Sequence, residues 1–177
     1  MKIAETQVRG VMPNAPQDRI RAFVKCFDEW SDTFGIDTKQ RAAHFLSQVA
    51  HESAEMKYLE EIASGRQYEG RKDLGNTRPG DGMRFKGRGL LQLTGRANYQ
   101  AYADSEYCVG DLMSHPEWLA KFPGALKSAM WYWKKRNLNR YADRDDTEGL
   151  CRAINGGLSH YAQRLYYWRK AKKALWI

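Results

Sequence analysis

The sequence has no apolar run that approaches the roughly 18 residues of a membrane-spanning helix. Its first ten residues include Lys2, Glu5 and Arg9 and lack an apolar core, so they are not expected to act as a secretory signal. We therefore expect a chain that is made in the cytoplasm and does not insert stably into a membrane.

Cysteine is also scarce. Cys26, Cys108 and Cys151 are far apart and odd in number, which suits neither a disulfide framework nor the paired spacing of a zinc site. No repeat of fixed period and no low-complexity segment is present. These absences predict three reduced cysteines, no metal site and an ordinary globular chain.

Positive charge is present in excess and is unevenly placed. The chain carries a formal net charge of +8, yet residues 121–177 hold 13 Lys and Arg against 4 Asp and Glu. A basic surface favours a polyanionic partner, which can be nucleic acid, anionic lipid or an anionic cell-wall polymer. Charge alone does not choose among the three.

Apolar residues recur at helical spacing over much of the chain. Positions 20, 23, 24, 27 and 30 predict a helix over 18–34, and Asp37-Thr38 offers an N-cap for a second helix that includes positions 42–50. Helical patterning returns at 96–103, 124–135, 146–154 and 159–175. The 177 residues fit one domain, so we predict a mainly α-helical single catalytic domain over 1–177.

The middle of the chain differs from the rest. Residues 64–88 contain Pro79 and six glycines among many charged side chains, and this density of chain-breaking residues predicts a loop or a short hairpin. Long loops in compact domains are usually functional or mobile. We expect this segment to form one irregular wall of the molecule.

Two acidic residues are candidates for acid–base chemistry. Glu52 lies at the end of the second predicted helix, beside apolar Val49 and Ala50, and such surroundings suit a general acid. Glu61 follows nine residues later. On one unbroken helix the two would face opposite ways, about 13 Å apart along the axis. They can share a cleft only if the helix ends between them and the chain turns back.

Two further segments carry polar side chains among glycines. The first runs from Arg84 to Tyr99 and includes Gln92, Thr94 and Asn98, whose neutral donors and acceptors suit sugar amides and hydroxyls. The second is Ile154-Asn155-Gly156-Gly157, which predicts a turn between two helices. Arg164 follows it.

Taken in order, these elements resemble glycoside hydrolase family 19, the family of chitinases and related phage endolysins. The resemblance rests on His51-Glu52-Ser53, the acid nine residues on, Gly87–Gly95 with Asn98-Tyr99, and Ile154–Gly157. It extends from about Pro13 to the last helix. Phage and prophage lysins share the phrases at 45–53 and 68–77 most closely.

The resemblance implies a lysozyme-like α-helical fold and an inverting mechanism without metal or cofactor. It assigns the general acid to Glu52, the general base to Glu61 and the positioning of the attacking water to Thr94. It assigns substrate contacts to Gln92, Asn98, Asn155 and Arg164. The family usually has Gly-Gly after this motif, whereas this chain has Ala54-Glu55. Glu55, Glu60 and Glu69 therefore remain alternative bases.

The expected function is cleavage of β-1,4 bonds in bacterial peptidoglycan by a monomeric, endolysin-type enzyme. Such an enzyme would reach the wall once the inner membrane is breached. Chitinase activity on the same scaffold is the main alternative. A more distant alternative is single-stranded nucleic-acid binding by the aromatic and basic residues of the last third, including Trp131 and Trp133. We expect no nucleic-acid partner.

Overall fold

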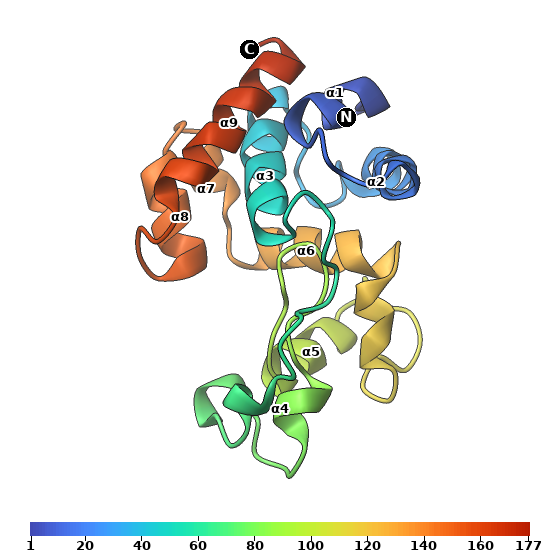
Figure 1. Ribbon diagram of the computed structural model, residues 1–177. Coiled ribbons are helices and arrows are strands. Elements are labelled where there is room, and N and C mark those ends of the chain that lie inside the picture. Colours follow the sequence, from blue (N-terminus) through green and yellow to red (C-terminus); the bar gives the residue numbers. More distant parts are fainter.

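The computed structural model describes residues 1–177 and is mainly α-helical, as predicted (Figure 1). None of the helices combines the length and the apolar composition that a membrane-spanning segment requires. The nine α-helices are α1 (Glu5–Val11), α2 (Gln17–Trp30), α3 (Lys39–Glu52), α4 (Asp81–Arg84), α5 (Arg96–Ala103), α6 (Gly124–Lys135), α7 (Asn139–Ala142), α8 (Thr147–Asn155) and α9 (Tyr161–Leu175). Three short 3₁₀ helices are η1 (Arg66–Tyr68), η2 (Lys72–Leu74) and η3 (Pro116–Ala120).

Helix bounds follow the apolar pattern closely where the pattern is strong. The helices predicted over 96–103 and 124–135 have those bounds as α5 and α6. The helix predicted over 18–34 ends earlier, at Trp30, because residues 31–35 form a turn that closes on Gly35 with a φ of 71°. Short α1 and α7 carry too few apolar positions to show a helical period.

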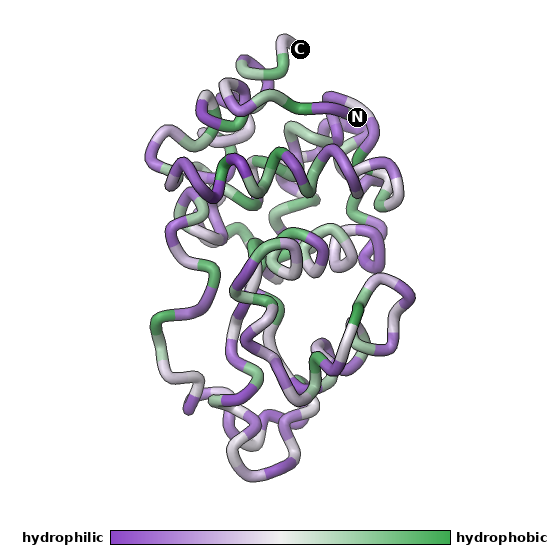
Figure 2. Tube along the Cα trace, turned by 90° about the vertical axis from the view of Figure 1, so that its right-hand side faces the viewer, coloured by the Kyte–Doolittle hydropathy of each residue, from purple (hydrophilic) through white to green (hydrophobic).

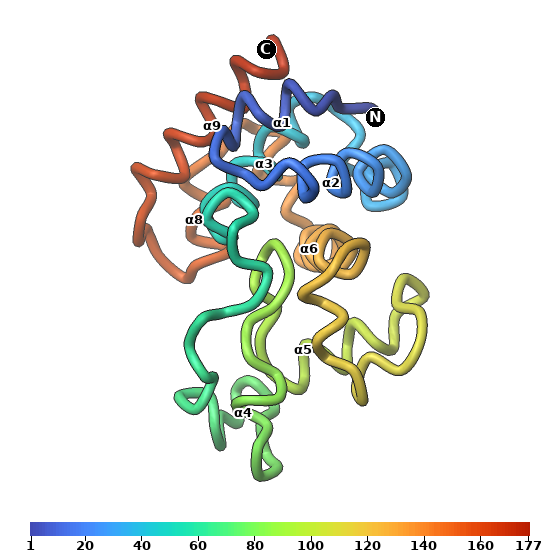
Figure 3. Tube along the Cα trace, turned by 45° about the vertical axis from the view of Figure 1, so that its right-hand side comes forward, coloured from blue at the N-terminus to red at the C-terminus, as the bar shows by residue number.

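Helix α3 lies at the centre of the upper part of the molecule, with α9 and α1 packed along it (Figures 1 and 3). Every residue from Ala42 to Ala50 is buried, and the core contains 38 buried residues in one cluster. Thr38 caps the helix as predicted, because its side chain accepts a hydrogen bond from the Arg41 amide at 3.2 Å. The far end of this fixed helix carries Glu52.

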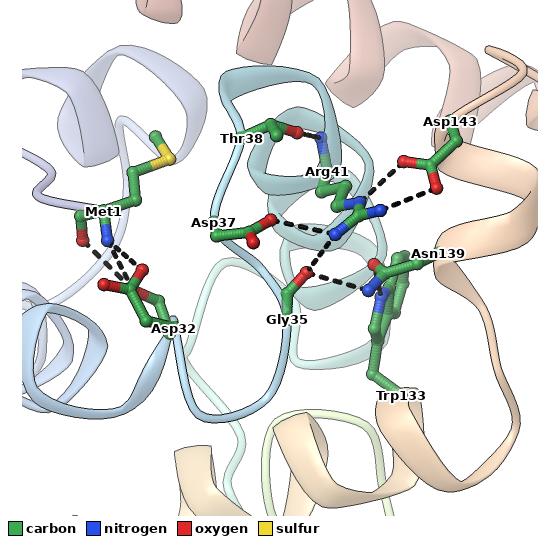
Figure 4. Close-up of polar contacts among 10 residues, drawn as sticks. Met1, Asp32, Gly35, Asp37, Thr38, Arg41, Trp133, Asn139 and Asp143 are labelled. Atoms are coloured by element: carbon green, nitrogen blue, oxygen red, sulfur yellow. Dashed lines mark hydrogen bonds and ion pairs between the residues drawn. The ribbon is translucent and has the colours of Figure 1, made fainter.

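A polar network fixes the start of α3 against α7 (Figure 4). The Arg41 guanidinium donates to both carboxylate oxygens of Asp143, at 2.6 and 2.8 Å, and to the carbonyl of Gly35. Asn139 donates to the same carbonyl and accepts from the Trp133 indole at 2.7 Å. These contacts join segments about a hundred residues apart, so α3 is held at its N-terminal end as well as along its length.

The Gly-rich segment forms the lower part of the molecule without a β-ladder. It contains η1, η2 and α4, and only isolated bridges pair Glu60 with Arg88 and Arg88 with Leu93. The lowest part is mostly hydrophilic (Figure 2). Polar contacts hold it together, since the buried Asp81 carboxylate accepts two hydrogen bonds from Arg96 and the Asn76 amide donates to the Tyr68 carbonyl.

Buried histidine in α3 makes the free energy of unfolding depend on pH. His44 is fully buried beside the Asp145 carboxylate, and burial lowers its pKa despite that carboxylate. In the unfolded chain His44 therefore binds a proton near pH 6.5, whereas in the folded chain it binds this proton only at lower pH. We expect the thermal unfolding midpoint to fall as the pH drops from about 7.5 to 5.5, a window above the titration of the carboxylates. His44→Gln should show a shallower fall, and a midpoint that rises on acidification would contradict this assignment.

Candidate active site

Glu52 and several predicted site residues line one groove between α3, α8 and the segment before α5. The groove has a volume of about 310 Å³. Its polar lining consists of Glu52, Gln92, Thr94, Asn98 and Asn155, and its apolar lining of Leu74, Leu91, Leu93, Tyr132 and Ile154. Five of the seven side chains proposed from the sequence are thus brought together from four segments of the chain. A groove with apolar walls and converging polar groups is the usual form of a ligand site.

Arg164 is placed differently from the prediction. The family resemblance implies a substrate contact for Arg164, but its side chain is only 3% exposed and lies behind Glu52. One guanidinium nitrogen contacts the Glu52 carboxylate at 2.5 Å, and another contacts the Gln48 side chain at 2.6 Å. Arg164 therefore orients Glu52 and does not face the groove.

The surroundings of Glu52 are accordingly more polar than the sequence suggested. Its side chain is 22% exposed, which leaves it open to the groove, and its inner oxygen is paired with Arg164. Burial and the nearby Arg164 lower the pKa of the adjacent His51. A neutral His51 adds no positive charge beside Glu52, so Arg164 is the cation that holds this carboxylate.

The chain reverses directly after Glu52. Helix α3 ends there, and Ala54, Glu55 and Met56 all adopt left-handed backbone conformations, with φ of 48°, 59° and 61°. A non-glycine residue in the left-handed backbone conformation destabilises the folded state by roughly 1 kcal/mol. The condition for Glu52 and Glu61 to share a cleft is therefore met without the glycines that usually follow the motif.

Buried polar contacts hold this strained turn in place. The Glu55 carboxylate accepts hydrogen bonds from the Asn14 amide at 2.7 Å, the Asn14 side chain at 3.2 Å and the Tyr167 hydroxyl at 3.0 Å. Burial and this carboxylate raise the pKa of Tyr167 to about 12, so Tyr167 remains a donor. Ser53 also donates to Val49 and accepts from the Met56 amide. These contacts offset the backbone strain.

Glu61 then pairs with the segment that precedes α5. Its amide donates to the Gly87 carbonyl at 2.9 Å, and its carboxylate accepts from Gln67, from the Tyr68 hydroxyl and from the Gly87 amide. Burial and the Glu61 carboxylate raise the pKa of Tyr68, which keeps its hydroxyl a donor. The Glu61 carboxylate is thus held on two sides.

Gly87 lets three predicted site residues converge. A Cβ atom at this position would lie 2.9 Å from the Gln92 side-chain oxygen, 3.2 Å from a Glu61 carboxylate oxygen and 3.3 Å from the Thr94 hydroxyl. The first distance is too short for any larger residue without a shift of its neighbours. Glu61 therefore lies beside Thr94 and Gln92, which themselves line the groove with Glu52.

The three alternative bases are engaged elsewhere. Glu55 is buried in the turn described above. Glu60 contacts Lys86 at 2.7 Å and Arg88 at 3.3 Å, and although burial opposes it, these cations hold its pKa below the usual value. Glu69 accepts hydrogen bonds from the amides of Gly80 and Gly82. Of the four acids, Glu61 is the one whose carboxylate lies beside Thr94 and Gln92.

The neutral site residues are held by backbone contacts. The Thr94 hydroxyl donates to the Gln92 carbonyl, the Asn98 side chain to the Thr94 carbonyl and the Gln92 side chain to the Gly89 carbonyl, all at 2.8–2.9 Å. Asn155 is exposed at the end of α8. No three His, Cys, Asp or Glu side chains gather in a way that could hold a metal ion.

Sequence reasoning missed several participants. Gln48 lies one helical turn before Glu52, and this spacing of four residues was a signal that the two share a face. Tyr68 and Gln67 contact Glu61 from η1, and nothing in their local sequence indicates this. Tyr132 lines the groove, although the basic and aromatic character of its neighbourhood suggested a different role.

Comparison with known proteins places the chain among glycosidases. No family model matches it. A glycosyl hydrolase family 19 domain-containing protein of Haemophilus influenzae is 27% identical, over 96% of this chain and 95% of that protein. An endochitinase of Arabidopsis thaliana is 33% identical over 77% of this chain. The chain spans 46% of that plant protein, which is therefore much the longer of the two.

The fold agrees with the sequence similarity. Chitinase C from Streptomyces griseus superposes with a TM-score of 0.76 at 20% identity, over 98% of this chain and 92% of that chain. At this identity the likeness establishes the fold, which is the predicted lysozyme-like fold of the family 19 chitinases. Since the sequence similarity also spans nearly all of a family 19 protein, this chain is a glycoside hydrolase of family 19.

Proposed function

We propose that this enzyme cleaves β-1,4 bonds of bacterial peptidoglycan, as an endolysin does. The net charge of +8 is the observation that favours peptidoglycan over chitin, because wall polymers bear carboxylates and phosphates whereas chitin is neutral. The proposal includes action on the wall by a monomer, after the inner membrane has been breached. It involves no cofactor.

In the proposed reaction Glu52 is the general acid. Its outer face opens to the groove, where a glycosidic oxygen can approach, and Arg164, which is itself held by Gln48, fixes it from behind. Protonated Glu52 gives its proton to the leaving oxygen as the bond to the anomeric carbon breaks. Positioning by Arg164 limits the freedom of this carboxyl, which lowers the entropic cost of reaching the reactive geometry.

Glu61 is the proposed general base. A water molecule held by the Thr94 hydroxyl and the Glu61 carboxylate attacks the anomeric carbon from the opposite face, and Glu61 takes its proton. Gln67 and Tyr68 orient the carboxylate without neutralising it. Gln92, Asn98 and Asn155 offer amide groups to the sugar substituents, since they line the same groove.

Chitin is the alternative substrate, favoured by the likeness to an Arabidopsis endochitinase and to the fold of a Streptomyces chitinase. A turbidity assay on purified wall, run beside an assay on chitin oligomers, separates the two. Faster turnover of neutral oligomers than of wall would favour the chitinase.

Nucleic-acid binding gains little support from the side chains that suggested it. Trp131 and Trp133 are buried in the core, where they cannot stack on bases, and Tyr167 is buried beside Glu55.

We expect Glu52→Gln to abolish wall lysis while leaving the fold intact. Gln can still accept the Arg164 hydrogen bond but cannot donate a proton to the leaving oxygen. Loss of a general acid typically costs on the order of 10² to 10⁴ in rate. Turbidity clearance and circular dichroism measure the two effects. A well-folded variant with more than about a tenth of the wild-type rate would remove Glu52 from this role.

Glu61→Gln should lose activity to a similar degree, and Glu60→Gln is its matched control. Both changes remove one carboxylate from adjacent positions, but Glu60 is paired with Lys86 and Arg88 and does not contact the residues around Thr94. We expect the Glu60 variant to keep most of the wild-type rate. Equal losses in the two variants, with equal thermal stability, would contradict the assignment of the base.

The reaction should invert the configuration of the anomeric carbon. Thr94 beside Glu61 offers a place for water between the acid and the base, and an inverting pair needs that water. Proton NMR of the first product from a soluble oligosaccharide should show the α-anomer before mutarotation. A first product in the β form would instead require a retaining mechanism.

A further inference from the structure

A second groove lies between α1 and α9, away from Glu52. It has a volume of about 480 Å³, within the range of roughly 300–1,000 Å³ that is usual for ligand sites. Helix α1 contributes Thr6 and Gln7, and the other side contributes Tyr166, Lys170, Lys173 and Trp176. Figure 1 shows this end of α9 beside α1 at the top of the molecule, whereas α8 and the site segments lie below.

The groove exposes large aromatic side chains. Trp176 is 78% exposed and Tyr166 is 56% exposed. The Lys170 ammonium lies 5.4 Å from the centre of the Tyr166 ring. Flat aromatic faces of this kind stack on the apolar faces of rings, while their polar edges remain in water. Thr6 and Gln7 add neutral donors and acceptors that suit hydroxyl and amide groups.

The two lysines of the groove have no acidic partner. All four acidic residues of 121–177 are engaged elsewhere: Asp143 with Arg41, Asp145 with Lys172, Asp146 with the Gly149 amide and Glu148 with Arg152. Lys172 is thus paired, and it does not belong to the unpaired charge on α9. Lys170 and Lys173 are left to attract an external anion.

We infer that this groove is a second, non-catalytic binding site for a glycan strand that carries carboxylates, namely the peptide-bearing strand of the wall. Sugar rings stack on Trp176 and Tyr166, and peptide carboxylates face Lys170 and Lys173. The inference rests on the proposed function for the identity of the polymer. Arg164 and Trp176 lie at opposite ends of α9, about 18 Å apart along the helix axis, so one polymer mesh can reach both sites.

Binding to purified sacculi, free of lipid and nucleic acid, tests this inference. The variants are made on a Glu52→Gln background so that the polymer is not digested. We expect Lys170→Gln with Lys173→Gln to weaken co-sedimentation at about 50 mM salt by roughly fivefold or more, and the difference to shrink as screening increases near 300 mM. Trp176→Ala should weaken binding about tenfold at either salt concentration, since stacking is not screened.

The matched control is Lys25→Gln with Lys39→Gln. It removes the same charge from exposed positions on α2 and α3, where no acidic partner is lost. A loss of binding equal to that of the Lys170 and Lys173 pair would mean that only net charge matters and would overturn the site. An unchanged affinity in Trp176→Ala, or stronger binding to anionic vesicles or oligothymidine than to sacculi, would also overturn it. Unfolding midpoints check that each variant is folded.

Catalysis is measured separately in the Glu52 wild-type background. Turnover of a short neutral oligosaccharide should be the same with and without the Lys170 and Lys173 changes, because neither residue lies near the catalytic groove. If the enzyme cuts no wall polymer but the variants still lose binding to sacculi, the proposed substrate fails and the second site stands. If wall is cut and binding is unaffected, the second site fails alone.

Discussion

The buried Glu55 carboxylate holds the left-handed turn that ends α3, and the relative placement of Glu52 and Glu61 depends on this contact. The turn leaves Glu52 as the last residue of a helix fixed by the core and sends the following chain back toward Gly87. Asn14 and Tyr167, the partners of Glu55, come from the loop after α1 and from α9. Segments remote in sequence therefore determine where Glu61 lies relative to Glu52.

The two proposed catalytic carboxylates are held by different physical means. Glu52 projects from a helix that is buried over nine consecutive residues, and a buried arginine orients it. Glu61 belongs to a segment with little apolar core, where backbone pairing to Gly87 and side chains from η1 fix it. Apolar packing thus fixes the segment that carries Glu52, whereas the segment that carries Glu61 depends on hydrogen bonds, which open locally more readily.

The strong helices and the membership of the groove were predictable from sequence, because periodicity and family motifs report directly on them. The reversal after Glu52 was not predictable. Local propensity argues against left-handed Ala54, Glu55 and Met56, and the contacts of Glu55 that help to stabilise them are made 41 and 112 residues away. The resemblance implies a substrate contact for Arg164, because no local sequence feature reveals that its guanidinium is buried against Glu52 and Gln48.

Helix α9 contributes residues to the surroundings of Glu52, to the turn after α3 and to the basic surface. Near its start, Arg164 points inward and needs the Glu52 carboxylate, since a buried cation without a partner would destabilise the fold. Further along, Tyr167 anchors the strained turn through Glu55. On other faces of the same helix, Lys170 and Lys173 remain free because the acids of this region already have partners. The excess positive charge of residues 121–177 therefore lies at the surface. The buried charge of Arg164, in contrast, is paired with the Glu52 carboxylate.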